Sequence, residues 1–151
     1  YLTGKKLKYG IIQDVLIATE YNANDKGFKV FLGGLGFKLD LPGFKSFNIN
    51  FYYRDQIGYS GDTYQITANW NYPIELAGLK FRISGFADWA GPEGDKKENL
   101  LFVPQIVMDI GHLFNKPNRL YAGVEYSNWT SKFGVQGQNE EHFQFLVKFH
   151  F

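Results

Sequence analysis

Apolar and polar residues alternate along most of this chain, with the period of two that is typical of β-strands whose faces meet different surroundings. The alternation is clearest in three consecutive runs, residues 47–56, 63–72 and 79–89. In each run one face is apolar or aromatic, and the other carries mostly Asn, Gln, Thr or charged side chains. These runs predict neighbouring strands of a sheet that has one apolar and one polar face.

Five weaker runs bring the expected total to about eight strands: residues 8–21, 28–39, 100–113, 120–126 and 143–151. Gly33, Gly34 and Gly36 interrupt the second of these runs and indicate a bulge or a kink. No apolar run approaches the roughly 20 residues that a membrane helix needs. The sequence therefore predicts a single all-β domain over residues 1–151.

The last run, FQFLVKFHF, places Phe143, Phe145, Val147 and Phe149 on one face and ends on Phe151. In a soluble protein such an edge strand would invite aggregation. The run resembles the C-terminal strand of bacterial outer-membrane barrels, in which the terminal aromatic belongs to the signal read by the assembly machinery. The resemblance implies that Phe151 is an assembly signal. A half-buried edge strand of a soluble sheet is the alternative.

The apolar face has two possible directions, because a lipocalin-like soluble barrel turns it inward and a membrane barrel turns it outward. Two features favour the membrane. Aromatic side chains lie near the ends of the apolar rows, as in an interfacial girdle: Tyr53, Trp70, Tyr72, Trp89 and Tyr126. The opposite face is rich in Asn, Gln and Thr, which suits a hydrated interior. We therefore expect an antiparallel transmembrane β-barrel.

The connections between the runs alternate in character. Those at residues 41–43, 73–78 and 115–118 are compact, whereas those at 91–99 and 130–141 are longer and more polar. Outer-membrane barrels have short periplasmic turns and longer external loops. The compact connections are therefore expected in the periplasm, together with both chain ends, as an even number of strands requires.

Composition narrows the function. The net charge is +1 without a basic block, which argues against nucleic acid as a partner. There is no cysteine, and His112, His142 and His150 lack the spacing of metal ligands. No Ser/His/acid set is evident either, so we expect no metal, no cofactor and no enzyme. The opening residues, YLTGKKLKYG, contain no apolar segment of a signal peptide.

Several stretches resemble the Tsx-like family of nucleoside-specific outer-membrane channels: FNINFYYRD (47–55), GDTYQI (61–66), FADWAGPEGDKKENLLFVPQ (86–105) and YAGVEYSNWTSKFGV (121–135). The resemblance implies monomeric twelve-stranded barrels in the outer membrane of Gram-negative bacteria. With about eight strands, the chain looks like the C-terminal two-thirds of such a barrel, with N-terminal strands missing. A reduced relative that cannot conduct is the alternative.

The polar face holds the residues expected to line a solute pathway: Tyr52, Arg54, Lys80, Arg82, Phe86, Asp88, Asp109, Tyr121, Glu125 and Lys148. Aromatic faces stack on a nucleobase, and a permeation path needs several weak sites in series. The mixed charges suit a neutral, flat solute better than a phosphate. For any single residue, the alternative is a structural role in which opposite charges pair and brace the wall.

The sequence thus predicts passive diffusion of nucleosides or similar small solutes across the bacterial outer membrane. The charged segment GPEGDKKEN (91–99) is expected to be a solvated loop, and such loops also suggest a receptor for phage or colicins. The expected partners are the lipid bilayer, the barrel assembly machinery and the permeating nucleoside. The alternative function is a small closed eight-stranded barrel that acts structurally or in adhesion through its external loops.

Overall fold

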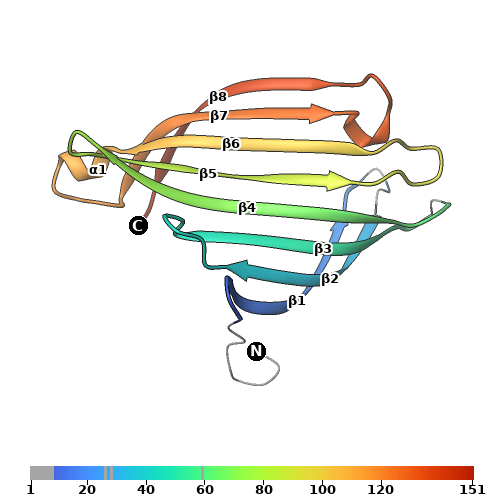
Figure 1. Ribbon diagram of the computed structural model, residues 1–151. Coiled ribbons are helices and arrows are strands. Elements are labelled where there is room, and N and C mark those ends of the chain that lie inside the picture. Colours follow the sequence, from blue (N-terminus) through green and yellow to red (C-terminus); the bar gives the residue numbers. More distant parts are fainter. Residues whose placement is uncertain (1–8, 26, 28, 59) are drawn as a thin grey trace.

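The computed structural model describes residues 9–25, 27, 29–58 and 60–151. Its strands form one antiparallel sheet in the order of the chain (Figure 1). The strands are β1 (Ile12–Ala23), β2 (Lys29–Leu39), β3 (Ser46–Gln56), β4 (Thr63–Leu76), β5 (Leu79–Ala90), β6 (Asn99–Asp109), β7 (Leu120–Thr130) and β8 (Glu140–Phe149). The prediction of an all-β fold with about eight strands is confirmed.

The sheet is an open meander. Each strand pairs with its neighbours in the chain, and β1 and β8 lie at opposite margins of the twisted sheet (Figure 1). Among the residues that the structure describes, these two margins do not pair with each other. Because β1 and β8 run in opposite directions, their unpaired edges have the polarity that an antiparallel closure requires.

Strand β4 is longer than its alternation predicts. The turn was expected over residues 73–78, and its predicted start is wrong. The strand continues through Pro73 to Leu76, and the turn consists of Ala77 and Gly78, both with left-handed φ angles of 51° and 77°. Pairing with β3 extends only to Asn71, so Pro73 pairs with β5 alone. A residue without an N–H is tolerated in a strand that has a partner on one side.

The predicted strand 100–113 is also too long. It ends at Asp109, and a single helical turn follows, α1 (Ile110–Leu113). The Asp109 side chain caps this turn by accepting from the backbone N–H of His112 at 3.1 Å. Strand β7, in contrast, extends past the predicted end to Thr130 and leads into a short 3₁₀ turn, η1 (Lys132–Gly134).

The predicted starts of the first two strands, Lys8 and Phe28, lie outside the described residues. The glycines of β2 produce no bulge, because pairing with β1 and β3 runs without a shift from Gly33 to Gly36. A Cβ on Gly34 would lie 1.9 Å from the carbonyl oxygen of Phe51, so glycine is needed there for close approach of the strands. In the described chain, neither helix has the length and apolar character needed to cross a membrane.

The two faces of the sheet differ in the way expected of a membrane protein. On the outer face Phe143 and Phe145 are 80% and 91% exposed. On the inner, concave face Asp109 is only 4% exposed, and Tyr52 is buried with Val30 and Leu32. A soluble sheet would expose its charges and bury its phenylalanines. The inverted pattern fits a sheet whose outer face contacts lipid.

The connections expected at one end lie there together, but the expected difference in length is wrong, because β6 ends at Asp109 and leaves residues 110–119 as a connection longer than either 91–98 or 131–139. One end of the sheet carries residues 40–45, 77–78 and 110–119 together with the C-terminus, and the other carries segments 91–98 and 131–139 (Figure 1). We call the second end the loop end. The candidate site lies there.

Candidate functional site at the loop end of the concave face

Strand register places all ten predicted pathway residues on one face. Directly opposed residues of an antiparallel pair point to the same side. The opposed pairs that connect the strands on this face are Arg54–Thr63, Thr67–Asp88, Ser84–Gln105, Gln105–Glu125 and Tyr121–Lys148. Alternation along each strand adds the remaining predicted residues. Their contact with a solute stays a prediction, but they share the concave wall.

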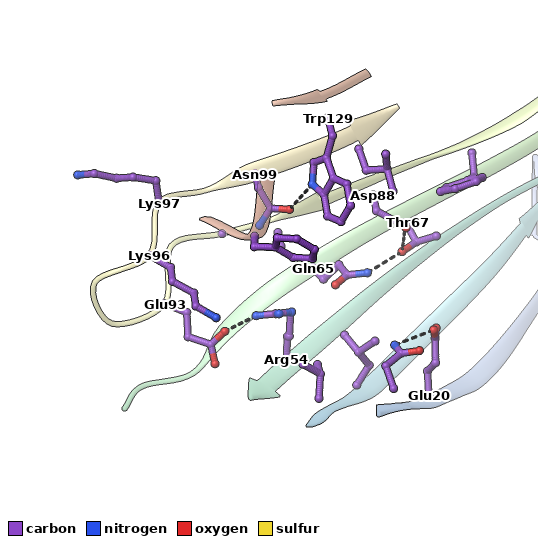
Figure 2. A pocket seen from close by; sticks show the side chains of 18 of the residues that line it. Glu20, Arg54, Gln65, Thr67, Asp88, Glu93, Lys96, Lys97, Asn99 and Trp129 are labelled. Carbon is purple, nitrogen blue, oxygen red and sulfur yellow. Dashed lines mark hydrogen bonds and ion pairs between the residues drawn. The ribbon is translucent and has the colours of Figure 1, made fainter. Parts of the chain in front are cut away.

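Three of the ten, Arg54, Phe86 and Asp88, line a cavity of about 550 Å³ at the loop end (Figure 2). Its wall comes from β1 to β7 and from the two long connections, whose contributions include Glu93, Lys96 and Phe133. The strands supply mainly amides, hydroxyls and apolar groups: Asn22, Val30, Leu32, Gln65, Thr67, Asn69, Ala90, Asn99, Leu101 and Trp129. The cavity is therefore polar but not dominated by one sign of charge.

A short hydrogen-bonded chain crosses the wall from β4 to β5. The amide of Gln65 donates to the hydroxyl of Thr67 at 3.2 Å, and this hydroxyl donates to the carboxylate of Asp88 at 2.6 Å (Figure 2). A carboxylate oriented by a hydroxyl keeps further lone pairs, because it can accept about four hydrogen bonds. Asp88 can therefore accept hydrogen bonds from a ligand.

Aromatic side chains form a second part of the lining. Phe86 comes from β5, and Trp129 from the end of β7. The indole of Trp129 donates to the side chain of Asn99 at 3.4 Å and packs edge-on against Phe133, with ring centroids 4.7 Å apart. The loop end thus offers flat apolar surfaces next to amide groups. Trp129 and Phe133 were not among the predicted pathway residues, because the strand predicted there ends at residue 126.

The largest departure from the sequence analysis concerns residues 91–98. We expected a solvated loop, but Glu93 is only 2% exposed. Its carboxylate forms an ion pair with Arg54 and accepts from the backbone N–H of Gln56 at 3.0 Å. Lys96 donates to the side-chain oxygen of Gln56 at 2.6 Å. No sequence signal distinguished Glu93 from the acidic residues around it, because its burial depends on the path of the loop.

Burial and the positive charge of Arg54 lower the pKa of Lys96, and the negative charge of Glu93 partly opposes them. The effect shows that Lys96 lies in a partly desolvated cluster of charges. Through Glu93 and Lys96, the segment 91–98 therefore forms part of the cavity wall.

A second group of predicted residues lies outside this cavity, on β5 to β8. The guanidinium of Arg82 lies 4.2 Å from the ring centroid of Tyr121. Lys148 donates to Gln105, and the amides of Gln105 and Gln144 both donate to Glu125. In these contacts the charged groups are satisfied within the wall by amides and an aromatic ring, and not by direct pairing of opposite charges.

The remaining predicted residues have separate surroundings. Asp109 caps α1 and also accepts from the backbone N–H of Asn118 at 2.8 Å, which is a structural role. Lys80 is exposed beside the turn at residues 77–78, and Tyr52 packs in the small apolar cluster of β2 and β3. Phe151 is fully exposed beyond the end of β8.

Histidines and carboxylates do not assemble a metal site in the part of the chain that the structure describes. His142 lies 2.6 Å from a carboxylate oxygen of Glu140, and His150 packs edge-on against Tyr121. Each of these two histidines thus contacts a protein side chain nearby, which accounts for its position without a ligand.

The chain matches a known protein family. The family model described as "nucleoside-specific channel-forming protein, Tsx" matches residues 1–134, most of the chain. This is a family of outer-membrane channels, not of enzymes. No curated protein and no solved structure matches the chain. The matched range includes β1 to β7 and the whole loop-end cavity.

Proposed function

Since the chain belongs to the family of the nucleoside-specific channel-forming protein Tsx, we propose that it forms a passive channel for nucleosides or similar flat, uncharged solutes. Its location would be the bacterial outer membrane, with the loop end outside. The observation that supports the proposal most directly is the lining of the loop-end cavity, where aromatic rings, amides and a hydrogen-bonded carboxylate occur together.

This lining complements a nucleoside. The faces of Phe86 and Trp129 suit a nucleobase, because stacking on an aromatic ring tolerates any base and contributes about 1–3 kcal/mol per contact. Asp88 and the amides of Gln65 and Asn69 suit the hydroxyls of ribose and the base edges. Such contacts are individually weak. Solutes can therefore enter and also leave, as a permeation path requires.

Charge at the site argues against a phosphate as the preferred solute. The guanidinium of Arg54 is already engaged by Glu93. A phosphate site would present free guanidinium or ammonium groups in a fork or cluster. The pairing instead suits solutes without net charge.

The proposal also includes the oligomeric state, the assembly and a receptor role of the protein. The chain would work as a monomer in the bilayer, with Phe151 read by the barrel assembly machinery. The exposed parts of segments 91–98 and 131–139 would be the attachment points if phage or colicins use this protein as a receptor. The alternative remains a closed structural or adhesion barrel, which the charge network around Glu125 would brace.

Conductance of the reconstituted protein in planar bilayers, titrated with adenosine and thymidine, tests the proposal. We expect steady single-channel currents that micromolar to millimolar nucleoside blocks. Phe86→Ala should weaken the block roughly 10-fold, because one stacking contact is worth about 1–3 kcal/mol. An outer-face substitution, Phe102→Ala, is the matched control. A folded protein that carries no current would leave the structural alternative.

A further inference from the structure

The connection between β5 and β6 folds back against the cavity instead of extending into solvent. Glu93 reaches the end of β3, where it meets Arg54 and the backbone of Gln56 (Figure 2). The side chains of this ion pair are 12% and 1% exposed. Lys96 adds a third contact to the same strand end through Gln56. All three contacts join one loop to one strand that is not its neighbour in the sheet.

The second long connection, residues 131–139, packs against segment 91–98. The backbone N–H of Lys97 donates to the carbonyl of Gly134 at 2.8 Å, which links segment 91–98 to η1. The fit is close, because a Cβ on Gly134 would lie 2.6 Å from the Cβ of Lys96. Phe133 of the same turn lines the cavity. The two long connections therefore form one contiguous border at the loop end, attached to β3 through Glu93.

The charges on this border and on the wall balance. The cavity is lined by three acidic side chains, Glu20, Asp88 and Glu93, and by three basic ones, Arg54, Lys96 and Lys97. Glu93 is the acidic member supplied by the loop, and it contacts Arg54 directly. If Glu93 were neutral, the guanidinium would remain at the wall without its carboxylate, and cations would outnumber anions.

We propose that residues 91–98 narrow the channel at the cavity, where the charges of the lining side chains balance, and that Glu93 determines the specificity there. Its carboxylate both fixes the loop against the wall and cancels the charge of Arg54, so that the wall presents no unpaired guanidinium to a phosphorylated solute. This inference rests on the proposed function as far as permeation is concerned. The attachment of the loop can be tested without permeation.

Ion selectivity tests the charge balance. Reversal potentials across a KCl gradient give the chloride-to-potassium permeability ratio. In Glu93→Gln this ratio should rise about 25-fold, because one uncompensated charge about 4 Å from the ion path in water favours chloride about fivefold and disfavours potassium about fivefold. Adenosine monophosphate should then block the variant at concentrations that leave the unaltered protein open. Glu140→Gln is the matched control, because Glu140 pairs with Lys132 at the same end but does not line the cavity.

The double variant Arg54→Gln/Glu93→Gln separates charge from attachment. It removes the ion pair without leaving a buried charge, so it should fold even where a single substitution does not. Its ion selectivity should equal that of the unaltered protein. Its loop, however, should be released. Unchanged selectivity in Glu93→Gln, or selectivity shifted equally by Glu140→Gln, would overturn the assignment of Glu93.

Trypsin digestion of the folded, reconstituted protein tests attachment alone. Cleavage after Lys96 or Lys97 should be slow in the unaltered protein and in Glu140→Gln, and faster in the double variant. Resistance of the double variant would overturn the attachment by the Arg54–Glu93 pair, whether or not the protein conducts. Release of the loop in a protein without current would uphold the attachment and reject only the proposed channel.

Discussion

Two buried carboxylates of the concave face show how differently single residues act in this wall. Asp109 accepts from two backbone N–H groups around α1 and thereby fixes the chain between β6 and β7. Glu93 accepts from Arg54 and from the backbone of Gln56 and fixes a loop to a strand. Both are acidic residues next to a strand end, and only their partners distinguish a cap from an ion pair.

Asp109→Ala should lower the free energy of unfolding by about 1–2 kcal/mol, because the cap of α1 is lost and two backbone donors lose their acceptor. Urea unfolding in lipid vesicles, followed by tryptophan fluorescence, measures the difference. Asp95→Ala, in the exposed part of segment 91–98, should leave the stability within about 0.5 kcal/mol. Equal stability of Asp109→Ala and Asp95→Ala would contradict the capping role.

Strand β8 shows at the scale of an element how one sequence serves two surroundings. Phe143, Phe145 and Val147 project to the outer face, where nothing in the described chain covers them. Gln144 and Lys148 project inward and join the network with Glu125 and Gln105. Adjacent residues of this strand should therefore respond in opposite ways to the same substitution.

Phe145→Lys should lower the free energy of unfolding by about 2–4 kcal/mol, the cost of a lysine on the lipid face near the bilayer midplane. Phe145 lies near the middle of β8. The neighbouring substitution Gln144→Lys should cost less than about 1 kcal/mol, since the new ammonium faces the interior and meets Glu125. Urea unfolding in lipid vesicles compares the two. A larger loss for Gln144→Lys would mean that the apolar face points inward.

At the scale of the whole molecule, the two ends of the sheet have different tasks. One end carries the turn at residues 77–78 and the segment 110–119 with its capped helical turn α1, whereas the loop end carries the cavity and its border. The strands connect these ends directly, so a chain that crosses the membrane presents them on opposite sides. The external position of the loop end follows from the architecture of outer-membrane barrels.

Single cysteines test this orientation, because the chain has none of its own. A membrane-impermeant maleimide added to intact cells should label Asp95→Cys and should not label Lys116→Cys. Both positions are exposed, at opposite ends of the sheet. Permeabilised cells provide the control, in which both should react. Labelling of Lys116→Cys alone in intact cells would reverse the orientation.

Most of the strands could be predicted because alternation is a local property. A residue on the wrong face of a strand would place a charge in lipid or a phenylalanine in the interior, so the pattern records the fold directly. The errors lie at strand ends. Pro73 read as a turn but continues β4 beyond the end of β3, and residues 110–113 read as strand but form a capped helical turn. In both cases a contact with a neighbour decides the outcome.

The sequence by itself determined the number of strands, the faces of the strands that alternate clearly and the shared wall of Tyr52, Arg54, Phe86 and the other polar-face residues. Each of these properties follows from residue spacing along one strand. Only the tertiary structure decided which of these residues surround the cavity, and that Glu93 and Phe133 join them. Those contacts join segments roughly 40 residues apart, such as Arg54 and Glu93, through loops whose path depends on the assembled sheet. Spacing along a strand carries no information about such a path.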